Sequence, residues 1–506
     1  MPNNQHFGKK HDDQWLDNLR ELSAVISQEG SHMQADLLDL AADLSRRVAR
    51  LWYGYFSKGI PLSTGGVENS LITMRDLRNN PNLKTFNIYR SDRGSVFINP
   101  EDIKKFLVEE NVISPSTNVH ELAASFCLGS HEGVMRIARC IYQPGNNDGV
   151  FFSTSCYGLL ATAFSTMQPL PYKVYLVDIH RDQGEKISLT HLKELARQHP
   201  SAKTLFLELK TMAGAIYTTE ELKNIILFCK EQNLFLIADT THINMSFNKK
   251  TVFPDVSSLS QQLDYHEFAI IYTTSKTYGL ERARVGFILT SKSLKSSSPT
   301  RIEIDMYRVI GASFDLPFEI ADKLLHYPLQ ERQQYLAYCA QKLRFNMNLM
   351  LAYIESVESK NIDEDLRELI KNGIPPAYRS GIPGITLIYK PQAGMHMKID
   401  ISGLKNKYLS NIKMFNSEIF CYALNKMQGV VTLHSYCILD PKGFSLRLSY
   451  SIKEDIHRGM QAMNDFVAAL SDCACENQFL PGTIEQASDL VSATHSKPTI
   501  TLQSRL

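Results

Sequence analysis

A lysine at the end of an apolar run is the residue most able to do chemistry in this sequence. In IIYTTSKTYGLERARVGFIL, residues 270–289, Lys276 follows a run typical of a buried strand, and Arg284 comes eight residues later. Partial desolvation lowers the pKa of a lysine and makes its amine a usable nucleophile. An arginine beside the hydroxyls of Thr273 and Ser275 suits a phosphate. Together they indicate a phosphate-bearing aldehyde, pyridoxal 5'-phosphate (PLP), held as a Schiff base.

A second candidate ends another apolar run. LFLIAD, residues 234–239, is typical of a strand and ends on Asp239. Ligands of open parallel sheets bind at the carboxyl ends of the strands, so Asp239 and Lys276 are expected in one crevice. The alternatives are a solvated loop around Lys276 and a simple turn cap at Asp239. Other strands of this sheet are expected at residues 150–152, 173–178, 204–209 and 268–272.

The elements around these strands define the fold class. Continuous apolar strands that alternate with amphipathic helices predict an α/β fold, with a mainly parallel sheet covered by helices on both faces. One helix begins at the capping box of Thr218 and Glu221. Gly129 and Ser130 precede another helix, whose first turn is suited to an anion, although such a pair is more often only a cap. A long helix is expected over residues 328–357.

A smaller α+β domain is expected after this helix. Its one-sided sheet would use strands at residues 396–402, 429–434 and 444–451, followed by a helix from Lys453. The predicted division of the chain is an N-terminal helical extension (1–60), a segment joining the small domain (61–110), a large PLP-binding domain (111–345), a small C-terminal domain (346–472) and a loose tail (473–506).

Composition narrows the classes of function. The chain has 506 residues, of which 43% are hydrophobic and 21% charged, with a net charge of +1. Nothing in this balance points to nucleic acid or to an anionic membrane surface. The nine cysteines are scattered without a disulfide framework or a metal-binding spacing. No signal peptide or membrane-spanning run is apparent, so we expect a cytoplasmic enzyme without a metal.

The lysine stretch also carries a family resemblance. TTSKTYGLERARVGF, residues 273–287, resembles the S-x-S-K-x-x-G-L…R-x-G signature of fold-type-I PLP-dependent enzymes of the aminotransferase class I/II family. The resemblance extends over roughly residues 60–470. It implies that Lys276 is the Schiff-base lysine and that Arg284 binds the cofactor phosphate, with Thr273 and Ser275 as the flanking hydroxyl positions.

The resemblance assigns further roles by position. It implies that Asp239 pairs with the pyridinium nitrogen of PLP and that Arg447 binds the substrate α-carboxylate, for which a planar guanidinium is suited. We place Gly66 beside Arg447 in the substrate site, because a glycine pair lets the backbone approach a ligand closely; a plain turn is the alternative. The other implied cofactor positions are Gly129 and Ser130 in the phosphate loop, Tyr157 stacked on the ring, and Tyr89 reaching the phosphate of the neighbouring subunit in a homodimer.

Two positions depart from the family pattern. The family's N-P-x-N-P-T-G run is replaced by ELKTMAG, which puts Thr211 where an asparagine contacts the phenolic oxygen of PLP. His242 stands three residues after Asp239, where the family commonly has tyrosine. Thr211 and His242 can both hydrogen-bond the phenolic oxygen, but they would shift its electronics and the pKa of the Schiff base. The sequence therefore predicts a divergent member of the family.

Three functions remain open from the sequence. The first is an aminotransferase that acts on an amino acid and a 2-oxo acid through Lys276. The second is another PLP-dependent reaction at the amino acid, by a decarboxylase, lyase or cyclase of a biosynthetic pathway. The third is a PLP-binding scaffold without catalysis. The side chain of the substrate is not identified by any of these residues.

Overall fold

The computed structural model describes residues 60–61, 98–166, 172–248, 251–302, 315–440 and 443–474. The expected N-terminal helices, Gly66, Tyr89 and the expected tail beyond residue 474 lie outside these residues.

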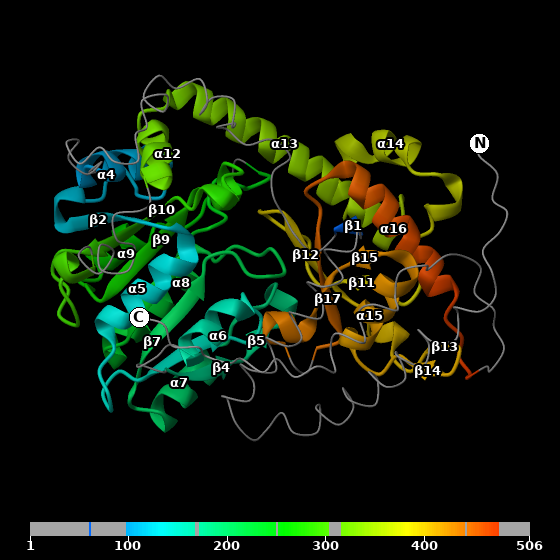
Figure 1. The fold of residues 1–506 in the computed structure, drawn as a ribbon, viewed down its shortest axis with the longest axis horizontal. Coiled ribbons are helices and arrows are strands. Elements are labelled where there is room, and N and C mark those ends of the chain that lie inside the picture. Colours follow the sequence, from blue (N-terminus) through cyan, green and yellow to red (C-terminus); the bar gives the residue numbers. More distant parts are fainter. Residues whose placement is uncertain are drawn as a thin grey trace, which may run out of the picture.

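A seven-stranded sheet forms the centre of the larger part of the molecule (Figure 1). Its strand order is β2-β10-β9-β8-β7-β3-β4, and β10 alone runs antiparallel to its neighbours. The strands are β2 (Leu122–Cys127), β3 (Gly149–Ser153), β4 (Lys173–Val177), β7 (Ala202–Glu208), β8 (Phe235–Asp239), β9 (Phe268–Thr273) and β10 (Gly286–Ser291). The expected mainly parallel sheet is therefore confirmed. Strand β2 was not predicted, because its small residues and half-buried positions weaken the apolar signal.

Helices cover both faces of this sheet. Alternate residues of β9 enter different hydrophobic clusters: Ile270 lies in one and Ile271 in the other. Helix α8 packs on the first face and helix α5 on the second, each through its apolar stripe. Burial on both faces explains why the central strands β8 and β9 are apolar until their last residue. The helices around the sheet are α4 (Pro100–Glu109), α5 (Gly129–Ile141), α6 (Gly158–Thr166), α7 (Leu189–Gln198), α8 (Thr219–Gln232), α9 (Val256–Gln262) and α12 (Asp315–Leu325).

The predicted start of α8 is confirmed. Thr218 Oγ1 accepts a hydrogen bond from the Glu221 backbone N–H at 3.2 Å, and the Glu221 carboxylate accepts one from the Thr218 N–H at 2.7 Å. The side chain of each residue thus accepts a hydrogen bond from the backbone N–H of the other, as a capping box requires. Helix α8 thereby begins at a fixed point after β7.

A smaller antiparallel sheet follows, with the order β11-β12-β17-β16. Its strands are β11 (Thr386–Leu387), β12 (His396–Asp400), β16 (Leu433–His434) and β17 (Ser445–Ser449). The single strand expected over residues 429–434 is wrong, because the run changes partner at the buried Thr432. Before it, β15 (Val430–Val431) pairs with β1 (Ile60–Pro61), whereas β16 after it pairs with β17. The helices of this part are α14 (Glu364–Gly373), α15 (Ser417–Gln428) and α16 (Lys453–Ala468).

Helix α13 (Leu329–Ile354) connects the two sheets, as Figure 1 shows. Tyr335 and Leu336 near its start pack against the core of the larger sheet, whereas its last turns are buried in the core of the smaller one. The long predicted helix is thus confirmed, and the predicted domain boundaries remain a prediction. In the described parts of the chain, no helix is long and apolar enough to cross a membrane. Short paired strands complete the fold: β5 (Ile179–His180) with β6 (Lys186–Ile187), and β13 (Tyr408–Leu409) with β14 (Ile412–Lys413).

We expect the core of the larger sheet to be sensitive to loss of volume. Ile237, at the centre of β8, is 0% exposed, so Ile237→Ala should lower the free energy of unfolding by about 3 kcal/mol through a cavity. Leu369→Ala is the control, because Leu369 is 63% exposed on α14 and its loss should cost less than about 0.5 kcal/mol. Denaturant unfolding of both variants measures the difference, and equal losses would contradict the assignment of this core.

Candidate active site

Two of the predicted residues lie at the same edge of the larger sheet. Strand β8 ends at Asp239, and strand β9 ends at Thr273, just before the short helix α10 (Thr274–Thr277) that contains Lys276. Because β8 and β9 are parallel neighbours, their carboxyl ends meet at one edge. Asp239 is buried, and the side chain of Lys276 is 24% exposed.

The amine of Lys276 is paired with a carboxylate that the sequence analysis did not single out. Its Nζ forms an ion pair with Glu281 Oε1, from the 3-10 turn after α10. Burial lowers the pKa of Lys276 below its ordinary value, and the charge of Glu281 raises it in part. Glu281 therefore helps to determine how much neutral amine is present at a given pH.

Asp239 is a buried carboxylate fixed by its own turn. Its Oδ1 accepts hydrogen bonds from the Thr241 hydroxyl and from the Thr241 backbone N–H, the latter at 2.7 Å. Burial raises the pKa of Asp239, and these hydrogen bonds act in the opposite direction. Both bonds go to one oxygen, so the orientation of the carboxylate at the end of β8 is fixed.

A guanidinium lies against the first turn of α5. Arg284 Nη2 donates to the Leu128 carbonyl at 2.8 Å, and Nη1 donates to the Glu281 carbonyl at 3.2 Å. Gly129, the first residue of α5, has a φ of +79°, and a Cβ there would lie 2.7 Å from Arg284 Nη2. Only glycine therefore allows this approach. Arg284 and the N–H groups around Gly129 and Ser130 form one cationic corner suited to an anion.

The two hydroxyl residues before Lys276 have different environments. Thr273 is fully buried, caps α10, and donates to the Val285 carbonyl at 3.2 Å, which ties α10 to the start of β10. Ser275 is half-buried, and its Oγ lies 2.9 Å from Thr273 Oγ1. Thr273 thus stabilises the loop that carries Lys276, and Ser275 is the more accessible hydroxyl.

The smaller sheet contributes Arg447. This residue lies in β17 and is 8% exposed. Tyr157, which follows β3 of the larger sheet, is 37% exposed, and its backbone N–H donates to Glu208 Oε1 at 3.2 Å. Burial raises the pKa of Tyr157, and the nearby charges of Arg447 and Arg284 lower it in part. Tyr157 is thus within electrostatic reach of arginines from both sheets.

Thr211 and His242 are placed differently from each other. The Thr211 hydroxyl accepts from the Ala215 N–H of its own turn at 3.1 Å and donates its one proton to the Gly184 carbonyl, in the loop before β6, at 2.6 Å. His242 Nδ1 is buried and has no hydrogen-bond partner among the described residues. Burial lowers the pKa of His242, and the charge of Lys210 lowers it further. His242 is accordingly a neutral imidazole at pH 7 with an available ring nitrogen.

Two further charged residues at this edge were missed by the sequence analysis. Glu208 is paired with Asp239 in the register of β7 and β8, so both side chains lie on the same face. Lys210 is 5% exposed, and its Nζ donates to the Thr211 carbonyl at 2.8 Å. Burial, followed by the charge of Asp239, raises the pKa of Glu208, and burial lowers the pKa of Lys210. The sequence did contain a signal for these two residues, because a glutamate and a lysine end the apolar run TLFLELK.

The site is therefore formed by two lysine amines, two buried carboxylates, a neutral imidazole and two arginines. Within the residues that the structure describes, no group of three or more His, Cys, Asp and Glu side chains is arranged to hold a metal ion. Such a set can bind an anion and a carbonyl compound at neighbouring positions, and it can exchange protons between them.

The fold is shared with solved aminotransferases. The aspartate aminotransferase from Rhizobium meliloti superposes with a TM-score of 0.62 at 12% identity, over 86% of this chain and 96% of that chain. A multiple substrate aminotransferase from Thermococcus profundus gives 0.61 at 14% identity, over 83% and 94% of the two chains. Similarity at these identities shows the fold alone.

Curated relatives match shorter segments. A mouse protein named "Probable inactive 1-aminocyclopropane-1-carboxylate synthase-like protein 2" is 23% identical over 169 residues, which are 30% of this chain and 28% of that protein. The human 1-aminocyclopropane-1-carboxylate synthase-like protein 1 is 30% identical over 77 residues, 15% of each chain. The aligned segments thus span less than a third of either relative.

The segment that builds the site also matches a family model. Residues 105–306 match the model of the family described as aminotransferase class I and II. This segment contains Asp239, Lys276 and Arg284, the three residues that carried the resemblance in the sequence. Over this segment the chain is similar to the aminotransferase class I and II family, and its fold is that of solved aminotransferases.

Proposed function

We propose that the protein is a PLP-dependent aminotransferase that acts on an amino acid and a 2-oxo acid. The observation that supports this proposal is the placement of Lys276, Asp239 and Arg284 at one edge of the larger sheet, with Arg447 contributed by the smaller sheet. An amine, a carboxylate and an anion corner in one place match the aldehyde, the ring nitrogen and the phosphate of PLP.

The residues present fit this cofactor. Lys276 would hold the aldehyde carbon, and Arg284 with the N–H groups at Gly129 would bind the phosphate. Asp239 would keep the ring nitrogen protonated, since a carboxylate there stabilises the positive charge. Bound PLP supplies an electron sink for the charge that develops at the substrate Cα.

The residues of the chain would supply positioning and proton transfer. Arg447 would bind the substrate α-carboxylate and so orient the Cα–H bond for removal. The amine of Lys276 would take the proton from the substrate Cα as general base and would later give a proton back as general acid. Tyr157 would cover the ring, and His242 rather than Thr211 has a ring nitrogen available for the phenolic oxygen.

Some predicted contributions remain part of the proposal only. Tyr89 would reach the phosphate of a partner subunit in a homodimer, and Gly66 would line the substrate site. Of the N-terminal segment before residue 98, the structure describes β1 (Ile60–Pro61), which pairs with β15 of the smaller sheet.

A second candidate is another PLP-dependent reaction at the amino acid, by a decarboxylase, lyase or cyclase. Two observations favour it: the proton of Thr211 is committed to Gly184, and the buried pair of Glu208 and Lys210 lies beside Asp239. The two curated relatives are named as 1-aminocyclopropane-1-carboxylate synthase-like proteins, and one is described as probably inactive. Cyclisation and a scaffold without catalysis are therefore also outcomes that the experiment below must distinguish.

The Lys276 amine is tested by cofactor attachment. Wild-type protein incubated with PLP and freed of excess cofactor should show a visible absorption band, and Lys276→Ala should show none. Lys426→Ala is the matched control, because burial also lowers the pKa of Lys426 but this residue lies on α15, away from the site. A band that survives in Lys276→Ala would contradict the assignment.

Product analysis with a panel of amino acids then identifies the reaction. Formation of a 2-oxo acid that depends on an added 2-oxo acid acceptor supports the aminotransferase, and Lys276→Ala should lower its rate roughly a thousandfold. Carbon dioxide, pyruvate with ammonia, or a cyclised amino acid would replace this proposal with the second candidate. A cofactor band with no product from any amino acid would indicate a scaffold.

The ion pair with Glu281 predicts a pH effect. Attachment of an aldehyde requires neutral amine, and the Glu281 charge raises the pKa of Lys276. Glu281→Gln should therefore lower this pKa and shift PLP attachment to lower pH. At pH 7 the attachment rate should increase about fivefold, as about 1 kcal/mol of lost ion pairing would give. Stopped-flow absorbance against pH measures this, with Glu281→Asp as the charge-preserving control; an unchanged pH profile in Glu281→Gln would refute the prediction.

A further inference from the structure

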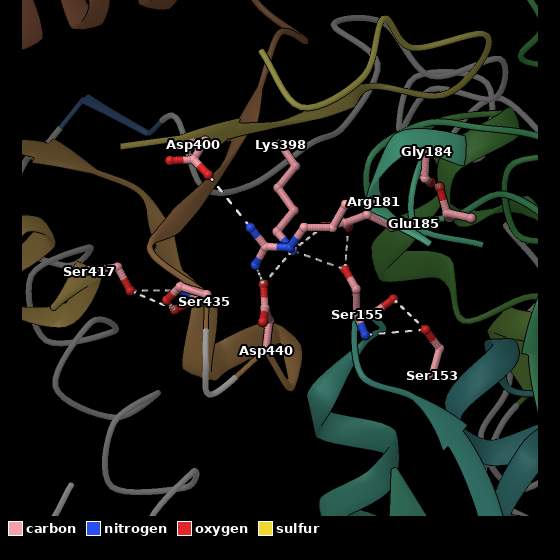
Figure 2. A network of polar contacts seen from close by, with 12 residues as sticks. Ser153, Ser155, Arg181, Gly184, Glu185, Lys398, Asp400, Ser417, Ser435 and Asp440 are labelled. Carbon is pink, nitrogen blue, oxygen red and sulfur yellow. Dashed lines mark hydrogen bonds and ion pairs between the residues drawn. The ribbon is translucent and has the colours of Figure 1, made fainter. Parts of the chain in front are cut away.

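A buried polar network lies where the loops of the larger sheet meet the smaller sheet (Figure 2). At its centre, Lys398 Nζ contacts Glu185 Oε1 at 2.6 Å, Asp440 Oδ2 at 2.8 Å and Ser155 Oγ at 3.3 Å. The side chains of Lys398 and Glu185 are both 0% exposed. The second oxygen of Glu185 accepts from Ser155 Oγ at 2.5 Å. The ammonium therefore has three acceptors, and its charge is compensated by two carboxylates.

The network continues to the surface through Arg181. Its Nη2 lies 3.1 Å from Asp440 Oδ2, and its Nη1 lies 3.6 Å from Asp400 Oδ2. The Arg181 side chain is 44% exposed, so this end is open to solvent while the Lys398 end is dry. Buried ions are tolerated only when charges and hydrogen bonds are balanced in this way.

Most of these contacts join the two parts of the molecule. Ser155, Arg181 and Glu185 come from loops between β3 and β7, whereas Lys398 and Asp400 lie in β12 and Asp440 follows the 3-10 turn Ser435–Ile438. Figure 2 shows the Lys398 and Arg181 side chains entering the network from the two sides. The Cys156 N–H also donates to the Ile438 carbonyl at 3.2 Å, which adds a backbone contact across the same boundary.

Members of the network adjoin three candidate site residues. Lys398 is paired with Arg447 in the register of β12 and β17, so the two side chains stand on the same face of the smaller sheet. On the other side, Ser155 lies two residues before Tyr157. The Gly184 carbonyl, next to Glu185, accepts from the Thr211 hydroxyl. A shift in the network would therefore move Arg447 relative to Tyr157.

We propose that Lys398 is a positioning residue, and that the clasp formed by Lys398, Glu185, Asp440 and Ser155 fixes Arg447 of the smaller sheet against Tyr157 of the larger one. The carboxylate-binding side of the site is thereby assembled before a ligand arrives. This inference rests on the proposed function in one respect, the role of Arg447 toward a substrate carboxylate.

Charge balance explains why Lys398 is the central member. Without its ammonium, Glu185 and Asp440 would remain as two neighbouring buried carboxylates, and among the described residues the half-exposed Arg181 would be the cation paired with Asp440. Like charges in a dry environment repel strongly, so the contact between the two parts would loosen. If Glu185 and Asp440 are neutralised at the same time, this repulsion is absent, and the contact is retained through neutral hydrogen bonds.

The experiment uses cofactor-loaded protein and the amino acid that changes the visible band of the wild type. Lys398→Met should raise the half-saturating concentration of this amino acid at least about tenfold, because a misplaced carboxylate anchor weakens binding. The band without amino acid should stay unchanged, since Lys276, Asp239 and Arg284 all belong to the larger sheet. The triple variant Lys398→Met/Glu185→Gln/Asp440→Asn should return to within about threefold of wild type.

The control removes a lysine ion pair that does not cross the boundary. Lys390→Met breaks the 2.7 Å pair of Lys390 with Asp363 and should leave the half-saturating concentration unchanged. If folded Lys398→Met binds the amino acid like the wild type, or if Lys390→Met weakens binding as much, the proposal is overturned. If Lys398→Met does not fold, Arg181→Gln takes its place. This variant should raise the half-saturating concentration of the amino acid about threefold, and an unchanged concentration would refute the proposal.

A second measurement separates this proposal from the proposed function. Hydrogen exchange of unloaded protein should show faster exchange at residues 153–157 and 433–440 in Lys398→Met and not in Lys390→Met. If the wild type gives no cofactor band, the proposed function fails, and hydrogen exchange still tests the clasp. Unchanged exchange in Lys398→Met would refute the clasp whatever the cofactor result.

Discussion

The register of the parallel strands β7, β8 and β9 is the constraint on which the site depends. Parallel neighbours end at one edge, so the residues that follow their buried runs are brought together. Asp239 and Glu208 face the same side because they are paired in this register. A slip of one residue would turn both carboxylates to the other face of the sheet. Burial of the strands on both faces by α5 and α8 prevents such a slip, because every position of β8 and β9 is packed.

The charged side chains at the carboxyl edge of the larger sheet lie close to groups of opposite charge. Lys276 is opposed by Glu281, and Glu208 lies among the charges of Lys210 and Asp239. Deeper in the boundary between the sheets, Lys398 is opposed by Glu185 and Asp440. An isolated buried charge would cost several kcal/mol, so the pairing makes a site rich in charges compatible with a stable fold. The same pairing makes the protonation of each group depend on its partner.

Similarity to solved aminotransferases at 12–14% identity shows how little of the sequence the fold requires. In this chain the fold rests on the pattern of buried strands and amphipathic helices, together with a few positions with special backbone needs. Gly129 is one of them, because its φ of +79° and the close approach of Arg284 exclude a side chain. Thr211 and His242, which depart from the family pattern that the sequence resembles, are accommodated within this architecture.

The sequence by itself determined the strands and helices with strong periodicity, the mainly parallel sheet, and the placement of Asp239 and Lys276 at its edge. Local spacing was enough, because buried strands and capping boxes are encoded in neighbouring residues. Tertiary structure decided which groups meet. It pairs Lys276 with Glu281, places Glu208 beside Asp239, and gives the Thr211 hydroxyl the Gly184 carbonyl as acceptor. It also decided that the run over residues 429–434 divides between two sheets and that Lys398 lies beside Arg447. These contacts join residues far apart in the chain, and no local pattern specifies which distant charge or strand a residue will meet.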